Sequence, residues 1–283
     1  GRYEETDGGW SWVSSSHVAI LDVADPSAVE PVASFHMPGR IADSRKVGDI
    51  LYTVTFENGW CWDCQPEPNT TVTSFDLSDL QEPLLVDQEV LPNDGVDYGW
   101  QKSISVTTDR IYVGGVEWSS SSYDRSTIRV VDISDPGGQL ALGASVQVNG
   151  QILSRWQMDE HEGVLRVISQ PWDTSVYPRI ETFSIQSSSV FTPLASTEIV
   201  TPIPESLRAV RFDGERAFAI TAEQIDPLFT IDLSDPAAPA VLGELEIPGW
   251  VFHIEPRGDR LLALGFDARS EEHTSELQSL TNL

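Results

Sequence analysis

The chain has 283 residues, 40% of them apolar, which is enough to bury the core of one or two globular domains or of one large all-β domain. Its formal net charge is -27, from 44 acidic and 17 basic residues. A surface of this negative potential repels phosphate backbones and anionic lipid, so nucleic acid is excluded as a partner. No stretch approaches the roughly 20 apolar residues of a membrane helix, and no transmembrane segment is predicted.

A short pattern recurs along the chain: an apolar, β-branched run, then Asp, an apolar residue, a small residue and a second Asp, in most copies followed by Pro. The copies lie at 19–26, 74–79, 130–136 and 230–236, with a degenerate one at 181–185. The period of about 50 residues is in the range of propeller blades. The second Asp of each copy is interpreted as a turn residue, because its side chain can accept hydrogen bonds from nearby backbone amides.

The best copy divides into four predicted strands, at 207–212, 216–221, 228–233 and 240–247, separated by turn residues such as Asp213-Gly214 and Pro248-Gly249. The predicted fold class is therefore all-β, a β-propeller of four-stranded antiparallel blades. Four complete blades are expected, between a half blade at 17–37 and another at 250–266. Because an open array leaves sheet edges unpaired, we expect the natural protein to extend beyond both ends.

Three further segments, 43–52, 107–113 and 158–167, resemble secreted bacterial and archaeal β-propeller domain proteins, which are distantly related to WD40 repeats. The Asp-x-Ser-Asp-Pro units also resemble a repeat of surface-exposed propellers, and together these motifs cover most of residues 17–266. The resemblance implies an extracytoplasmic propeller and carries over no catalytic residues.

The last residues lose the strand periodicity. Translated in frame, a widely used sequencing adapter gives the residues found at 269–279. We therefore expect a β-propeller fragment over 1–267 and a non-native or disordered tail over 268–283.

The only two cysteines, Cys61 and Cys64, are too few for a zinc site on their own. A local loop disulfide is the favoured interpretation, and it implies an oxidising compartment: secreted, cell-surface or periplasmic. A thioredoxin-like redox motif is the alternative, although no βαβ pattern surrounds the pair.

Aromatic residues gather in the connections expected at one end of the blades. In a four-stranded blade, the connection from the second to the third strand and the connection to the next blade emerge on the same side. The predicted ligand-binding face consists of Trp10, Trp12, Trp60, Trp62, Trp100, Trp118, Tyr123, Trp172, Tyr177 and Trp250. Exposed Trp side chains favour a protein, peptide or glycan partner. The alternative is that these loops only pack their own aromatics together.

No cofactor or metal site is predicted. Acidic residues interleave with the aromatic ones, which leaves calcium open as a ligand. Asp94 and Asp97 supply oxygen ligands but lack the full spacing of a calcium-binding loop.

Each predicted first strand carries a basic residue, and first strands line the central channel of a propeller. The predicted basic ring consists of Arg45 (or Lys46), Lys102, Arg155, Arg208 (or Arg211) and His253. One hypothesis is that the ring holds an anion or a carboxylate-bearing ligand. The other is that these groups pair with Asp43, Asp159 or inner carbonyl groups and only make the channel wall rigid.

Catalytic motifs are missing from the sequence. His17, His36, His161 and His253 fall on different predicted elements, and no nucleophile elbow, zinc-binding helix or phosphate loop occurs. We expect an extracytoplasmic binding module. The alternative is a propeller enzyme of the hydrolase, lyase or quinoprotein type, with its catalytic groups in missing blades or a partner domain.

Overall fold

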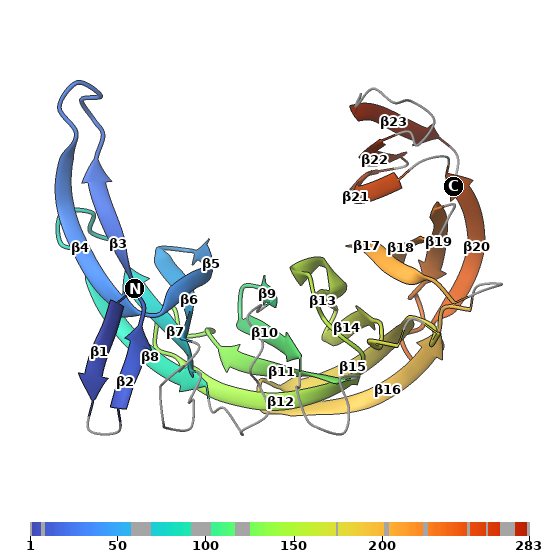
Figure 1. Ribbon diagram of the computed structural model, residues 1–283, viewed down its shortest axis with the longest axis horizontal. Helices are drawn as coiled ribbons and strands as arrows, with labels where there is room; N and C mark the ends of the chain where they lie inside the picture. Colours follow the sequence, from blue (N-terminus) through green and yellow to red (C-terminus); the bar gives the residue numbers. More distant parts are fainter. Residues whose placement is uncertain are drawn as a thin grey trace. The chain divides into compact units, whose positions relative to one another are not determined.

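The computed structural model describes residues 2–6, 9–57, 69–91, 103–116, 125–173, 175–200, 204–222, 226–247, 250–258, 260–266 and 275–281. Within these ranges the regular elements are β-strands, apart from one short 3-10 helix, η1 (Arg155–Gln157). Every sheet is antiparallel and is formed by strands that follow one another along the chain (Figure 1).

Four sheets have four strands each, and each is laid out in chain order. The first contains β5 (Arg40–Val47), β6 (Ile50–Glu57), β7 (Asn69–Asp76) and β8 (Leu84–Leu91). The second contains β9 (Ser103–Val106), β10 (Arg110–Val116), β11 (Arg125–Asp132) and β12 (Ala141–Asn149). The third contains β13 (Met158–His161), β14 (Val164–Ser169), β15 (Arg179–Ser187) and β16 (Val190–Glu198). The fourth contains β17 (Ser206–Asp213), β18 (Arg216–Ala222), β19 (Asp226–Asp232) and β20 (Ala240–Ile247).

Smaller sheets precede and follow these four. A hairpin of β1 (Arg2–Thr6) and β2 (Gly9–Val13) is followed by a second hairpin of β3 (Ser15–Asp22) and β4 (Glu30–Pro38). The final sheet contains β21 (Trp250–Arg257), β22 (Arg260–Phe266) and β23 (Ser275–Thr281).

The predicted fold class is confirmed: four antiparallel four-stranded sheets lie between incomplete ones, and the strands of 206–247 agree with their predicted positions. Trp10 and Trp12 are predicted in a connection between strands, whereas residues 2–13 form the β1–β2 hairpin. In the predicted tail, residues 275–281 pair with β22 as β23. The non-native origin of the tail stays a prediction.

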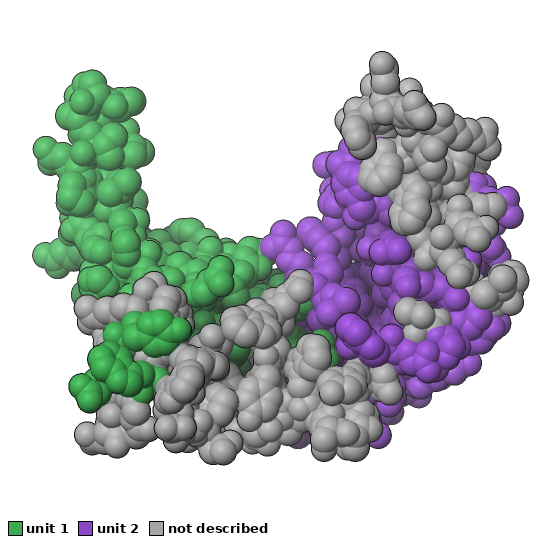
Figure 2. Space-filling model, viewed as in Figure 1, with its two compact units in different colours: residues 1–119, 128–145 green, residues 120–127, 146–283 purple. Residues whose placement is uncertain are grey.

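The chain divides into two compact units, which are coloured in Figure 2. Unit 1 comprises residues 1–119 and 128–145, and unit 2 comprises residues 120–127 and 146–283. Each unit contains the packed faces of successive sheets.

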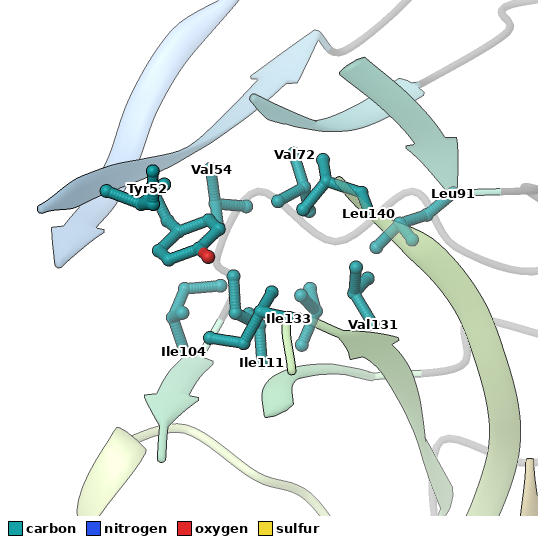
Figure 3. Packing of buried hydrophobic residues seen from close by; sticks show 11 residues of the cluster. Tyr52, Val54, Val72, Leu91, Ile104, Ile111, Val131, Ile133 and Leu140 are labelled. Atoms are coloured by element: carbon teal, nitrogen blue, oxygen red, sulfur yellow. The ribbon is translucent and has the colours of Figure 1, made fainter. Parts of the chain in front are cut away.

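The core of unit 1 lies between the β5–β8 sheet and the sheet that follows it (Figure 3). Val54 and Val72 from the first sheet pack against Ile111 and Val131 from the second. β7 shows the consequence, because every residue from Thr70 to Phe75 is buried, whereas a sheet with one solvated face would alternate. The middle strands of a blade therefore bury both faces.

Unit 2 repeats this packing. Ile168 and Ile180 from the third sheet belong to one buried cluster with Val210 and Phe229 from the fourth. The opposite face of the fourth sheet packs Ile220 against Ile254 of β21.

The repeated aspartates are turn residues, as the sequence predicts. Asp25, Asp135 and Asp235 each accept a hydrogen bond, of 2.9 Å, from the backbone N–H two residues later. Asp76 and Asp232, which end third strands, accept from the backbone N–H groups of Ser78 and Ser234. These bonds stabilise the carboxylate form and hold the pKa of both Asp76 and Asp232 below the ordinary value of 3.8.

We predict that acid destabilises the fold through these turns. Because the folded-state pKa lies below the unfolded value, the stabilisation is present above about pH 4 and is lost as the pH falls through the folded-state pKa. Asp232→Asn keeps an acceptor oxygen but cannot be protonated, so its melting temperature should fall less than that of the wild type between about pH 5 and about pH 2. Thermal unfolding followed by circular dichroism measures this. The control is Glu246→Gln, which alters an exposed carboxylate. If the melting temperature falls equally with pH in the wild type, in Asp232→Asn and in this control, the prediction is contradicted.

Candidate functional site

Only part of the predicted aromatic face falls within the described residues. Trp60, Trp62, Trp100, Trp118 and Tyr123 lie outside them, as do Cys61, Cys64, Lys102, Asp94 and Asp97. Trp12 and Trp250 lie in β2 and β21, but their side chains are outside the description. The remaining members are Trp10, Trp172 and Tyr177.

Trp172 lies in the connection between β14 and β15. The base of this connection is fixed by Gln170, whose side chain donates to the carbonyl of Glu205 and accepts from the N–H of Leu207. Asp173 accepts from the backbone N–H of Ser175 at 2.9 Å and closes a turn directly after the tryptophan. Trp172 nevertheless stays 63% exposed. An ordered loop thus presents a large amphipathic ring to solvent.

Trp10 is placed by a different element. It lies on β2, opposite Glu5 of β1, and is 51% exposed. Tyr177 is half-buried near the end of the β14–β15 connection.

The predicted basic ring separates into residues with different environments. Arg45, on β5 in unit 1, forms an ion pair with Asp43 at 2.6 Å, and Lys46 donates to the carbonyl of Gly48. In unit 2, Arg208 is exposed on β17. Arg155 was expected on a first strand, but it lies in η1, directly before β13. The strand begins later because the side chain of Ser154 caps this helical turn.

A cationic cluster forms around Trp156 in unit 2. The guanidinium carbon of Arg211 lies 3.5 Å from the centre of the Trp156 ring, and that of Arg155 lies 4.6 Å from it. His253 of β21 meets the same indole edge-on, with the ring centres 6.4 Å apart. We call Arg155, Trp156, Arg211 and His253 the inner cluster.

Arg211 is the buried member of the inner cluster, with 5% of its surface exposed. Its Nη1 donates to the carbonyl of Val210, and its Nη2 lies 2.9 Å from Nδ1 of His253. The same Nη2 lies 3.4 Å from Nε2 of the ring, and because a guanidinium only donates, the imidazole is the acceptor in this contact. The Nε atom is buried and finds no hydrogen-bond partner among the described residues.

The electrostatics of Arg211 are those of a partly desolvated cation. Burial lowers the pKa of Arg211, while the nearby charge of Glu255 raises it. Glu255 lies 3.4 Å from Arg257 and pairs with it instead. Within the described part of the chain Arg211 therefore makes no ion pair of its own.

Metal-binding clusters are not found in the described residues. They contain no group of three or more His, Cys, Asp or Glu side chains arranged to hold a metal. His17 and His36 face each other across β3 and β4, with ring centres 6.0 Å apart. His161 ends β13, remote in sequence from both.

The stacking in the inner cluster predicts an energetic coupling. A guanidinium on an indole, partly desolvated, contributes about 1–2 kcal/mol. Trp156→Ala should lower the free energy of unfolding by more in the wild-type background than in Arg211→Met, with a coupling of about 1 kcal/mol or more. Urea denaturation of the four proteins of this cycle measures it. Additive effects would show that the stack contributes nothing.

The fold places the chain in a class: all-β repeat proteins built from four-stranded propeller blades. A family model described as "Beta propeller domain" matches residues 60–281, so the chain belongs to the β-propeller domain family. An uncharacterized protein of Methanocaldococcus jannaschii is 33% identical over 129 residues, which is 44% of this chain and 20% of that protein. An uncharacterized protein of Archaeoglobus fulgidus is 34% identical over 133 residues, covering 45% and 19%. The matched part is thus about a fifth of the length of either relative.

Solved structures agree with the fold. A chain from a structural and mechanistic analysis of two prolyl endopeptidases superposes with a TM-score of 0.56 at 17% identity. The superposition covers 99% of this chain and 39% of that one. At this identity the likeness is one of fold alone.

Proposed function

We propose that this β-propeller is an extracytoplasmic binding module and that its ligand, a protein, peptide or glycan, docks on the tryptophan-rich loop face. The observation that carries the proposal is Trp172, which is 63% exposed on a connection whose base and turn are hydrogen-bonded. Exposed Trp rings held in ordered loops lose little conformational freedom when a ligand packs on them. A carbohydrate ring, which stacks on an indole, is the ligand we test first.

A catalytic role is less well supported. The described residues contain no group of three or more His, Cys, Asp or Glu side chains arranged to hold a metal. The enzyme alternative needs catalytic residues elsewhere in the protein. Two lines of argument support an extracytoplasmic location: the predicted Cys61–Cys64 loop disulfide and the resemblance to secreted propellers.

The loop-face proposal predicts that Trp172→Ala weakens ligand binding by about tenfold, since a buried aromatic contact at a binding site contributes about 1.4 kcal/mol or more. Glycan and peptide arrays identify the ligand, and titration calorimetry then compares the variants. Leu242→Ala is the matched control, because Leu242 is equally exposed but lies on β20. A ligand that binds wild type and Trp172→Ala with the same Kd would refute the loop face. Turnover of an array ligand would favour the enzyme.

We also propose that the inner cluster holds a carboxylate or another small anion. A buried guanidinium without an ion pair of its own is costly, and an anion would offset that cost. Acetate or phosphate at millimolar concentration should raise the melting temperature of the wild type but not that of Arg211→Met. Arg129→Met is the control, since Arg129 is a partly exposed arginine of β11 in the other unit. Equal anion effects on all three proteins would leave the cluster with a purely structural role.

A further inference from the structure

A cavity of about 460 Å³ lies in unit 1 between the β5–β8 sheet and the sheet that follows it. Its walls come from the turns and strand ends of both sheets. Three carboxylates, Asp49, Asp76 and Asp135, line it together with the hydroxyls of Ser78, Thr108 and Ser134. The apolar part of the wall consists of Val47, Ile50, Ile133 and Pro136. The cavity therefore combines negative charge with aliphatic surface.

Tyr52 reaches this cavity from β6. It is only 2% exposed, yet it is one of the lining residues. In Figure 3 its ring extends from β6 towards Ile111 and Ile133 of the next sheet, with the hydroxyl oxygen at the far end. Among the described residues the hydroxyl has no hydrogen-bond partner. Burial raises the pKa of Tyr52, and the charge of Asp135 raises it further, so the phenol stays neutral.

The carboxylates of the cavity retain capacity for a ligand. Oδ1 of Asp76 accepts from the N–H of Ser78, and Oδ1 of Asp135 accepts from the N–H groups of Gly137 and Gln139. Asp76 also takes a hydrogen bond from the side chain of Ser78. An ionised carboxylate has about four acceptor positions, so both aspartates can accept from a further donor. Asp49 already lies 3.4 Å from Lys46. Asp76 and Asp135 are therefore the two carboxylates best able to bind an added cation.

The internal repeat shows what the corresponding position does in another blade. Tyr52 pairs across β6 and β7 with Ser74, whose hydroxyl donates to the carbonyl of Gly138 at 2.7 Å. At the same place in the third sheet, Arg166 pairs with Thr182, whose hydroxyl donates to the carbonyl of Pro236 at 2.6 Å. Both acceptors belong to the Asp-Pro turn of the following sheet. Arg166 is thus the repeat equivalent of Tyr52.

The guanidinium of Arg166 is itself a cation that lies between the third and the fourth sheet. Arg166 is 2% exposed, donates to the carbonyl of Gly214 in the next sheet at 2.5 Å and forms an ion pair with Asp159. Tyr52 brings no charge to the equivalent place, and there the structure has a cavity lined by carboxylates. In the fourth sheet Phe218, which pairs with Thr230, also brings no charge to this position. In the cavity beside Tyr52, the positive group of a ligand would take the place that the Arg166 guanidinium has in the third sheet.

We propose that this cavity, the Tyr52 cavity, binds an aliphatic ammonium group, with Asp76, Asp135 and the Tyr52 hydroxyl as its acceptors and the apolar wall around its alkyl chain. A bare metal ion fits less well, because the described residues contain no set of three acidic or histidine side chains close enough to ligate one. A free diamine and a lysine side chain share this chemistry. The site is separate from the loop face and does not rest on the proposed function.

Titration calorimetry of the whole chain with 1,5-diaminopentane tests the proposal, with Nα-acetyl-lysine methylamide as the second probe. Wild type should bind at least one of the two saturably and should not bind 1-pentanol. Tyr52→Phe keeps the ring and should weaken binding by about tenfold, because a hydrogen bond to a charged group is lost. Asp135→Asn should weaken it by at least as much.

Two further variants serve as controls for binding in the Tyr52 cavity. Asp25→Asn alters the same kind of turn away from the cavity and should bind like wild type. Tyr52→Arg supplies the cation as Arg166 does, so it should abolish binding while remaining folded. If only the lysine derivative binds, the natural source is a protein side chain, and if the diamine binds as tightly, it is a free amine. No binding of either probe, equal binding of 1-pentanol, or undiminished binding in both Tyr52→Arg and Asp135→Asn would overturn the proposal.

Discussion

The packing of one blade against the next is the interaction on which this structure depends. A four-stranded sheet has two faces, and in both units the middle strands bury both, as the clusters around Val72 and around Phe229 show. Hydrogen bonds fix the alignment of these faces. A third-strand hydroxyl, Ser74 in one blade and Thr182 in another, donates to a carbonyl of the Asp-Pro turn in the next sheet. The repeated motif is therefore a connector between blades as well as a turn.

The same packing determines where charged side chains and ligand sites can lie. Tyr52, Arg166 and Arg211 are buried at such positions between successive sheets, so the polar atoms of these side chains need partners there. Arg166 is balanced by Asp159 and a carbonyl of the next sheet. Tyr52, at the equivalent position, leaves Asp76 and Asp135 facing a cavity. Arg211 is the opposite case, a buried cation stacked on Trp156 with an unsatisfied Nε atom. The two proposed sites would thus take ligands of opposite charge.

The sequence predicts the blades well because each carries its own turn chemistry: the Asp-Pro turns and the strands of 206–247 depend on neighbouring residues alone. The inner cluster could not be predicted in the same way. Side chains of a regular strand point alternately to its two faces, but a bulge between Leu207 and Ala209 shifts this alternation in β17. Counting residues along the strand therefore does not tell whether Arg208 or Arg211 faces inward. The capped turn at Ser154 likewise moves Arg155 and Trp156 off the strand. The Tyr52 cavity depends on side chains from two sheets, and no local pattern encodes it.

The central claim is that the space between two blades accepts a cation from outside where the chain supplies none. A crystal structure of the protein soaked with 1,5-diaminopentane tests this most directly. The account predicts electron density for an ammonium group within hydrogen-bonding distance of the Tyr52 hydroxyl and of Asp76 or Asp135. Density for the diamine only at other sites, or a side chain filling the cavity in its place, would contradict it.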